Sequence, residues 1–431
     1  MTGPTEHDLV TAADQVAAAA AHRSELWRGG FTRRRFLAGA GMVAAAALGS
    51  QLVTTRRSYA APGTATGRAL VVIFLRGGFD GLAAVVPAGD PDYLIARPSI
   101  GVPAEALLPL DRRFGLHPAL GALAPFFAAG QLGIVHAVGG GSGITRSHFQ
   151  AQDQIERGVD SPSTRTGWLE RALDLSGPGT TFRAVSEGIS SPASLAGSTT
   201  AVSLQGVDSV LLNRSSERMT TALRGLFSGL DLPVAEQVGL TLSLLAQTQS
   251  LRATPYTPAE GVRYPAGNLG AAMSDLARLI KADVGLRAAT VDVGGWDLHS
   301  NAGQVDNGDM TAHLAGLGSA LAAFATDLGD RLADTTVVTM SEFGRRVAEN
   351  GSGGTDHGGG NAMFLLGGGV AGGVVHGSWP GLAPAALVDG DLAGVNDYRD
   401  VVAEVARAQL GIGSVDTVFP GHRYTALGVV R

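Results

Sequence analysis

Cysteine is absent from the 431-residue sequence. Disulfide bonds, thiolate metal ligands and cysteine nucleophiles are therefore excluded. Any bound metal must be held by histidine, aspartate, glutamate or hydroxyl oxygen. Stability must come from burial of a core and from any metal that the chain binds.

An excess of positive charge is also lacking, because 32 Lys and Arg residues face 38 Asp and Glu residues and the net charge is −6. Lysine occurs only at Lys281. An acidic chain binds nucleic acid poorly, so we expect no nucleic-acid partner. After residue 60, no apolar stretch has the length of a membrane span.

The first sixty residues carry an export pattern. In residues 32–37, Arg33 and Arg34 precede a spacer and a Phe-Leu pair, which is the twin-arginine arrangement. A weakly apolar run over 38–53 and small residues at 58–60 complete a signal peptide. We interpret 1–31 as a flexible leader and 32–60 as the signal; the alternative is a basic membrane anchor. The pattern predicts use of the twin-arginine export machinery and a periplasmic, cell-envelope or extracellular location.

Residues 61–431 are predicted to form a single α/β domain. Apolar, β-branched runs predict buried strands, and amphipathic patterns between them predict helices. This alternation favours a largely parallel central sheet with helices on both faces. The region from about 160 to 262 is rich in Ser, Thr, Gly and Pro, and we expect it to form an irregular cap insertion over one edge of the sheet. The predicted strands cover 69–75, 131–138, 286–293, 335–340 and 362–366, and the predicted helices cover 118–129, 148–157, 234–250, 265–283, 311–329 and 396–410.

Glycine and polar residues gather just after these predicted strands. The chain has 62 glycines, and several flank the ends of the strands. In open α/β sheets the ligand site lies at the carboxyl ends of the strands. This edge carries Asp80, Thr145, Arg146, Ser147, His148, Asp297, His299, Glu342, Arg345, Asp356 and His357.

Two Asp and His pairs stand out among these residues. Asp297 and His299 lie two positions apart, so in an extended segment both point to one side. Asp356 and His357 are adjacent, and the flanking glycines permit a turn in which both converge. Oxygen and nitrogen ligands without sulfur suit zinc, manganese, magnesium or calcium. The pattern predicts a site for one or two divalent metal ions.

Six stretches occur in an order that resembles a known bacterial family. They are Leu75-Arg-Gly-Gly-Phe-Asp80-Gly-Leu, Ser147-His-Phe-Gln-Ala-Gln-Asp153, Val293-Gly-Gly-Trp-Asp-Leu-His299, Ser341-Glu-Phe-Gly-Arg345, Gly354-Thr-Asp-His-Gly358 and His376-Gly-Ser-Trp-Pro380. Over about Leu70 to Leu382, the sequence resembles the twin-arginine-exported family labelled domain of unknown function 1501. That family is grouped with the alkaline phosphatase and sulfatase superfamily.

The resemblance implies a two-metal hydrolase fold. It implies metal-ligand roles for Asp80, Asp297, His299, Asp356, His357 and a final histidine, which would be His376 or, as a weaker match, His422. Ser147 or Thr145 at the start of a helix would be the nucleophile, and Arg146 or Arg345 could hold a phosphate or sulfate oxygen pair.

The sequence departs from the superfamily pattern at two places. The first Asp and His are two rather than four apart, and Ser341-Glu342-Phe343-Gly344 stands where Ser-Asp-His-Gly is usual. Either Glu342 takes the aspartate's role while His357 comes from the later loop, or one metal site is lost.

Simpler interpretations remain open for individual residues. Asp80 could be a turn residue and Ser147 an ordinary helix cap. His148 could be a ligand, a helix-start residue or a contact to a carboxylate. Glu342 could be an ion-pair partner of Arg345 or Arg346.

The sequence therefore predicts an exported metal-dependent hydrolase that acts on a small-molecule or polymer-borne phosphate or sulfate ester. The alternative is a non-catalytic exported binding or assembly protein with an envelope protein as partner.

Overall fold

The computed structural model describes residues 67–140, 145–159, 161, 163–188, 190–197, 201–209, 216–227, 233–253 and 255–431. The predicted leader and signal over residues 1–60 lie outside the described residues. Within these ranges, none of the helices combines the length and apolarity needed to cross a membrane.

The described residues form strands, α-helices and short 3-10 helices. The strands are β1 (Ala69–Leu75), β2 (Val85–Val86), β3 (Leu108–Pro109), β4 (Gly115–Leu116), β5 (Leu132–Gly139), β6 (Ala184–Glu187), β7 (Ala201–Leu204), β8 (Ala288–Val293), β9 (Thr335–Met340), β10 (Gly344–Arg345), β11 (His357–Gly358), β12 (Asn361–Gly367), β13 (Val375–His376) and β14 (Asn396–Asp397). The α-helices are α4 (Gly81–Ala84), α5 (Asp92–Ala96), α6 (Ala124–Ala128), α7 (His148–Arg157), α8 (Trp168–Leu175), α9 (Ser216–Phe227), α10 (Pro233–Ala253), α11 (Asn268–Lys281), α12 (Asp309–Leu328), α13 (Tyr398–Leu410) and α14 (Val415–Val418). The 3-10 helices cover Ala104–Ala106, Pro118–Leu123, Ala193–Leu195, Val207–Ser209, Gly329–Asp334 and Pro384–Ala386.

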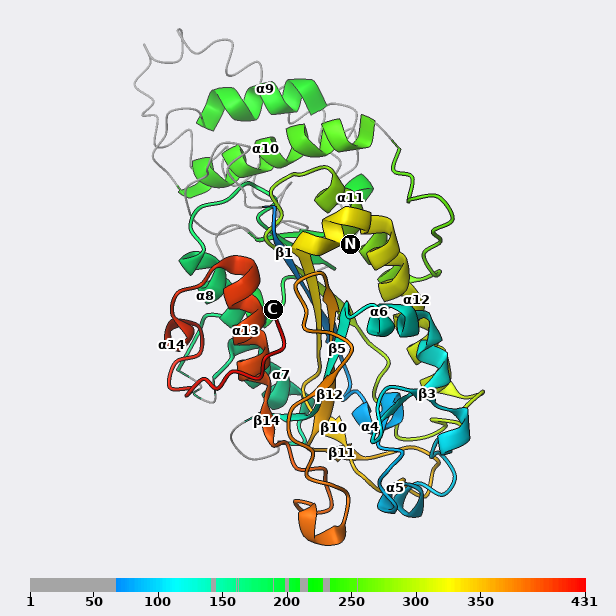
Figure 1. Ribbon diagram of the computed structural model, residues 1–431. Helices are drawn as coiled ribbons and strands as arrows, with labels where there is room; N and C mark the ends of the chain where they lie inside the picture. Colours follow the sequence, from blue (N-terminus) through cyan, green and yellow to red (C-terminus); the bar gives the residue numbers. More distant parts are fainter. Residues whose placement is uncertain are drawn as a thin grey trace, which may run out of the picture.

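A mainly parallel sheet forms the centre of the molecule (Figure 1). Its order is β13-β5-β12-β9-β1-β8-β6-β7, and β14 also pairs with β5. The central strand β1 is parallel to β8 on one side and to β9 on the other. Strand β12 runs antiparallel to both of its neighbours, β5 and β9.

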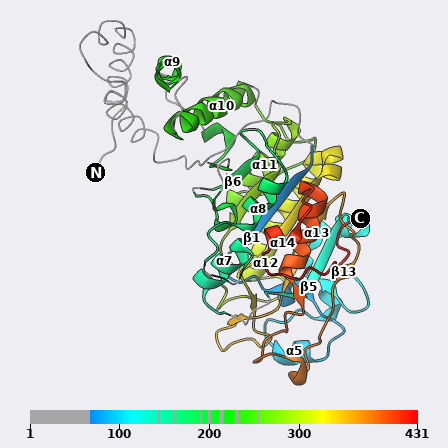
Figure 2. The ribbon, with the colours of Figure 1, turned by 90° about the vertical axis from the view of Figure 1, so that its left-hand side faces the viewer.

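Helices cover both faces of this sheet, as the two ribbon views show (Figures 1 and 2). On one face, residues of α11 and α12 share a core with alternate residues of β1, among them Val71 and Ile73. On the other face, α8 and α13 share a core with Leu70 and Val72. A strand buried on both faces explains why β1 is apolar at every position. The predicted α/β class, with a largely parallel sheet between helices, is confirmed.

The predicted strands all occur, with ends shifted by at most two residues. The structure differs from the expectation in the direction of β12, which does not follow the parallel arrangement. Strand β11 pairs antiparallel with β10, and only a short segment separates β11 from β12. No crossover helix can therefore return the chain to the other end of the sheet before β12 begins.

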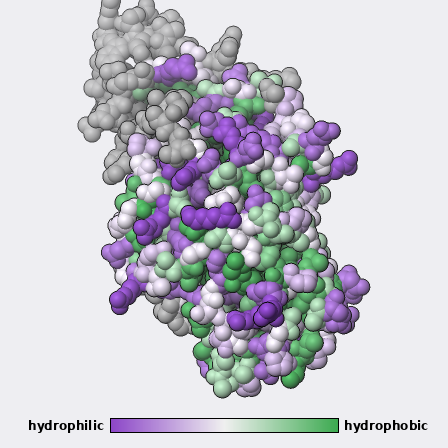
Figure 3. All heavy atoms as spheres, in the orientation of Figure 1, coloured by the Kyte–Doolittle hydropathy of each residue, from purple (hydrophilic) through white to green (hydrophobic). Residues whose placement is uncertain are grey.

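The segment predicted as a cap over about 160–262 contains regular elements. Strands β6 and β7 extend the sheet at one edge, and α8 packs against its face. Helices α9 and α10 lie at the end of the molecule opposite to β10 and β11 (Figure 1). The surface in this view is more hydrophilic in its upper part, and apolar residues are more frequent in its lower part (Figure 3).

Glu187 at the end of β6 makes stability depend on pH. Burial, followed by the nearby Asp275 carboxylate, raises the pKa of Glu187 to about 8. A raised folded-state pKa contributes stability that is complete below the unfolded pKa, near 4.5, and is lost as the pH rises through the folded value. The Glu187→Gln variant stays neutral at both pH values. We therefore expect the difference in free energy of unfolding between this variant and the wild type to shift in favour of the variant by at least about 1 kcal/mol from pH 5 to pH 8. Unfolding curves measured at both pH values test this, and a constant difference between the two proteins would contradict it.

Candidate metal centre

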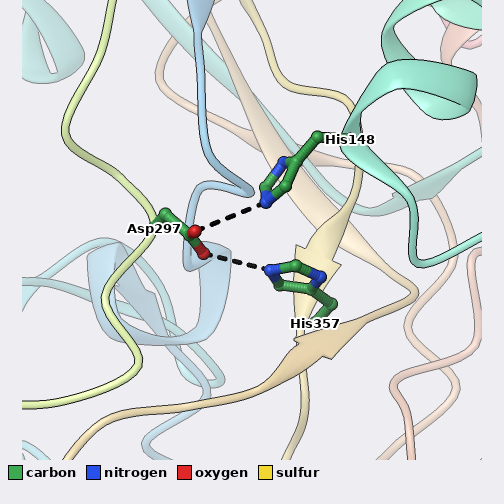
Figure 4. A group of neighbouring side chains, drawn as sticks. All are labelled: His148, Asp297 and His357. Carbon is green, nitrogen blue, oxygen red and sulfur yellow. Dashed lines mark hydrogen bonds and ion pairs between the residues drawn. The ribbon is translucent and has the colours of Figure 1, made fainter.

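Three segments that are distant in the sequence bring ionisable side chains together at the carboxyl ends of the strands. His148 begins α7, Asp297 lies in the loop after β8, and His357 begins β11 (Figure 4). One ligand atom from each of these three residues lies within 4.8 Å of the other two.

His299 adds a fourth side chain to this group, which we call the metal centre (His148, Asp297, His299 and His357). Its Nε2 lies 3.0 Å from Asp297 Oδ1 and 2.9 Å from His357 Nε2. His357 Nε2 is 3.0 Å from Asp297 Oδ1, and His148 Nε2 is 3.4 Å from Asp297 Oδ2. His299 and His357 therefore meet at one oxygen of Asp297, and His148 approaches the other oxygen of the same carboxylate.

The other ring nitrogen of each histidine has a fixed partner. The Nδ1 of His148 lies 2.8 Å from a Glu342 oxygen, and the Nδ1 of His299 lies 3.1 Å from an Asp356 oxygen. His357 Nδ1 lies 2.9 Å from the Arg146 carbonyl oxygen. Because these partners are acceptors, each ring donates from Nδ1 and keeps a lone pair on Nε2. This is the arrangement that orients histidines bound to a metal.

The chemistry of these donors fits a divalent cation. His148 Nε2 is buried and has no hydrogen-bond partner among the described residues. His299 and His357 bring two lone pairs to 2.9 Å, which is unfavourable unless a proton or a cation lies between them. Four ligand atoms that bind zinc at 2.0–2.1 Å in a tetrahedron lie about 3.3 Å apart. The separations of 2.9–3.0 Å among His299 Nε2, His357 Nε2 and Asp297 Oδ1, and of 3.4 Å between His148 Nε2 and Asp297 Oδ2, are close to that value.

The carboxylate of Asp297 stays ionised over a wide pH range. Burial opposes its charge, but the contacts of the carboxylate with His357 and with the Arg345 guanidinium outweigh burial and lower the pKa of Asp297 to about 2. The Asp297 side chain is 47% exposed, so the metal centre is open to solvent on one side. A small ligand can reach it from there.

Glu342 acts behind the metal centre rather than within it. Its side chain is fully buried, and its Oε1 accepts hydrogen bonds from Gly77 N, Gln152 Nε2 and His148 Nδ1, each at 2.8 Å. Burial alone would raise the pKa of Glu342, but these bonds, with the Gln152 amide first, lower it. The charged carboxylate therefore sets the orientation of the His148 ring. The sequence left several interpretations of His148 open. The structure supports a contact with a carboxylate, that of Glu342, and it also places His148 in the metal centre.

Asp80, expected as a ligand, lies in a buried ion pair instead. Its Oδ2 is 2.8 Å from the Arg97 guanidinium, whose side chain is fully buried, and its Oδ1 accepts from Ala83 N. A buried guanidinium needs an anion, and Asp80 supplies it. Both carboxylate oxygens are thereby bonded to other groups of the protein.

The two arginines expected to hold a substrate oxyanion are also engaged inside the protein. Arg345 is buried and donates to the backbone carbonyls of Gly77, Gly78, Trp296 and Thr355 and, at 2.6 Å, to Asp297. It is therefore a clamp that positions Asp297. Arg146 is 44% exposed and pairs with the buried Asp391 at 2.9 Å.

The remaining predicted residues occupy separate places. Asp356 positions His299 and accepts a bond from Asn350, and the Asn350 bond and then the His299 bond lower the pKa of Asp356. His376 lies in the edge strand β13, where its Nε2 is 2.7 Å from the Ala371 carbonyl oxygen. The structure does not bring His376 to the metal centre, because β13 pairs with the middle of β5. His422 contacts Asp400 at 2.7 Å near the C-terminus.

The two candidate nucleophiles precede α7. Ser147 takes the N-cap position, but its hydroxyl makes no capping bond. Thr145 Oγ1 donates to the Gln150 side chain at 3.1 Å and accepts from Ser147 N. Ser147 therefore has the freer hydroxyl, directly before His148.

Close backbone approaches hold the loops of the metal centre in place. Gly77 has a φ of +120°, and a Cβ there would lie 2.5 Å from the Asp297 nitrogen. A Cβ at Gly354 would lie 2.4 Å from the backbone of His299. Only glycine permits these contacts.

Sequence reasoning missed several supporting residues. Gln152 lies four residues after His148, so it falls on the same helix face, and this spacing was a usable signal. Arg97 and Asn350 lie in irregular segments, where no period shows which side chains turn inward.

Replacing Glu342 by glutamine is expected to weaken metal affinity about 10- to 100-fold, as loss of an orienting carboxylate does. The amide can still accept from Gly77 N, so the fold should remain. Glu404→Gln is the matched control, since Glu404 is also a buried carboxylate that accepts backbone bonds, far from the metal centre. Metal titration of both variants tests this, and equal affinities would contradict it.

Comparison with known proteins adds a family match and a loose structural likeness. The family described as "Protein of unknown function (DUF1501)" matches residues 143–411. No curated protein matches the sequence. The fold is similar to the lipoteichoic acid synthase LtaP from Listeria monocytogenes, with 10% identity, a TM-score of 0.28, and 70% of this chain and 66% of that chain covered. It is also similar to the PsFucS1 sulfatase from Pseudoalteromonas sp., with 10% identity, a TM-score of 0.36, and 99% and 78% covered. The chain thus spans just under two thirds of the synthase, and the fold assignment rests on the sheet itself.

Proposed function

The chain belongs to this family of unknown function, and from its metal centre we propose that it is a metal-dependent hydrolase of phosphate or sulfate esters. The observation that carries the proposal is the set of three histidines whose Nε2 atoms converge on Asp297 while each Nδ1 is held by an acceptor.

The ligand set favours one class of metal ion. Three imidazole nitrogens and one carboxylate suit zinc or manganese better than magnesium or calcium, which prefer oxygen. In the described residues, the other expected ligands are engaged elsewhere, Asp80 by Arg97 and Glu342 by His148 and Gln152. These contacts support a site for one metal ion rather than two.

The chemistry would combine the metal with the start of α7. A bound divalent ion supplies Lewis acidity toward an ester oxygen. Ser147 has a hydroxyl that makes no capping bond to the helix, and it directly precedes His148. The free N–H groups at the helix N-terminus favour negative charge close to that hydroxyl. Asp297 is held in place by Arg345, so the ligand geometry is set before substrate binds.

Ser147→Ala is expected to lower ester turnover by about 100-fold or more if this hydroxyl is the nucleophile, with metal content unchanged. Thr145→Ala is the matched control, since Thr145 is the neighbouring hydroxyl with internal partners. Steady-state rates on phosphate and sulfate esters provide the measurement. Equal rates for the two variants would exclude Ser147 as the nucleophile.

The function itself is tested by metal content and turnover together. The natively exported protein, purified without chelator, should carry about one equivalent of a transition metal. It should hydrolyse at least one ester in a panel of phosphates and sulfates, and a chelator should abolish that activity. Purified protein that binds no divalent metal would overturn the proposal.

A second candidate is a non-catalytic binding or assembly protein. It is favoured by the burial of Arg345, whose bonds to backbone carbonyls and to Asp297 leave that guanidinium unavailable to a substrate oxyanion. A stable complex with an envelope protein, together with bound metal and no turnover across the panel, would support it.

We also propose that the chain passes through the twin-arginine machinery to the periplasm, envelope or exterior. The Arg33-Arg34 pair supports this. An Arg33→Lys/Arg34→Lys variant that is still exported normally would contradict it.

A further inference from the structure

A cavity of about 440 Å³ lies beside the metal centre. It is enclosed by α7, the carboxyl ends of β5 and β9, the start of β12, and the segment before α13. This volume falls within the range of small-molecule sites in proteins. None of the interactions described above fills it.

The cavity and the metal centre share their walls. Glu342 lines the cavity and also holds His148 Nδ1 at 2.8 Å. Arg146 lines the cavity, and its carbonyl oxygen accepts from His357 Nδ1. Phe343 lines the cavity and has its ring 5.0 Å from the His148 ring and 4.7 Å from the His357 ring. The cavity and the metal centre therefore adjoin at these three residues.

The interior of the cavity is suited to an apolar group. Two of its polar side chains are already bonded to the protein: Ser341 donates to Leu75 O, and Asn361 donates to Phe343 O and accepts from Ala362 N. A polar group placed against these two side chains would have to compete with those bonds, whereas an apolar group would displace water at no such cost. The apolar lining comes from Val138, Ala151, Ile155, Met340, Met363 and Tyr398. Two methionines let the lining adapt to the shape of its occupant.

We propose that this cavity holds the alcohol part of the ester, so that the substrates are phosphate or sulfate esters of an aromatic or branched aliphatic alcohol. The inference rests on the proposed hydrolase function. The charged group of the ester lies toward the metal centre, and its apolar body lies in the adjoining cavity. Binding energy from burying that body adds to the contribution of the charged group.

Val388 offers a way to close the cavity without disturbing the core. It lines the cavity, and it is 49% exposed. Val388→Trp should fill the entrance with an indole. Val374→Trp is the matched control, because Val374 has the same exposure and does not line the cavity.

Binding is measured first with anilinonaphthalene sulfonate, an aromatic anion whose fluorescence rises in apolar sites. We expect Val388→Trp to weaken its binding by roughly tenfold or more and Val374→Trp to leave it unchanged. Turnover is measured next with the naphthyl and methyl esters of phosphate and sulfate. The KM for the naphthyl ester should rise in Val388→Trp by a similar factor, while the KM for the methyl ester stays the same.

The outcomes separate the two proposals. Equal probe binding in both variants and the wild type would overturn the cavity proposal, and so would equal effects on the naphthyl and methyl esters. If no ester is hydrolysed at all but the probe still distinguishes Val388→Trp from Val374→Trp, the hydrolase function and the assignment of the cavity to its substrate both fail, and only a site for an apolar anion is left.

Discussion

Replacing His357 by alanine is expected to remove nearly all of the bound divalent metal and all ester turnover that depends on it. His357 contributes an Nε2 to the metal centre, 3.0 Å from Asp297, and its ring also packs against His148 and His299. Loss of a ligand from a four-ligand site leaves only three donors, so affinity should fall by more than the 10- to 100-fold that removal of a supporting residue costs. Metal analysis of the purified variant and rates on the ester panel provide the measurement.

His376→Ala is the matched control for this experiment. His376 was also expected to be a ligand, but its ring lies at the sheet edge against the Ala371 carbonyl. Its removal should leave metal content and activity as they are. Loss of metal in His376→Ala, or full retention in His357→Ala, would show that the metal centre is assigned to the wrong residues.

Replacing Arg97 by alanine is expected to lower the free energy of unfolding by roughly 3–5 kcal/mol, because it strands the Asp80 carboxylate without its partner. The guanidinium is fully buried, pairs with Asp80 at 2.8 Å, and also donates to the Val347 and Arg346 carbonyls. Denaturant unfolding measures the effect. Arg112→Ala is the control, since Arg112 is exposed on the surface.

Asp80 itself provides a second test in the same experiment. The double variant Arg97→Met/Asp80→Leu removes both charges and should recover much of the lost stability. It should also keep its metal. If the double variant loses the metal, Asp80 is a ligand after all, and the ion pair is not its main role.

The positions of the central strands could be predicted because burial on both faces leaves a direct trace in the sequence. The run 69–75 is apolar throughout, the run 335–340 consists of β-branched residues and a methionine, and both form strands within the sheet. The direction of β12 left no such trace. An apolar run predicts a buried strand but not its direction in the sheet. The direction of β12 is set by its short connection from β11.

The same distinction applies to the metal centre. The grouping of Asp297, His299 and His357 followed from their places after strands, since the carboxyl ends of parallel strands meet at one edge. The partner that each charged side chain takes could not be predicted in this way. Whether Asp80 would meet a cation from a metal or from Arg97, and whether Arg345 would face substrate or backbone carbonyls, depends on contacts between segments far apart in the sequence.

The convergence of α7, the loop after β8 and β11 on one point also bears on how the chain resists unfolding. A cation bound there would act as a cross-link, closing a loop of 60 residues between Asp297 and His357 and a much longer one back to His148. Because these ligands come together only in the folded chain, the ion would be released on unfolding and would stabilise the fold by binding it selectively. In a chain without cysteine, resistance to unfolding would thus follow the free metal concentration and be indifferent to reducing agents.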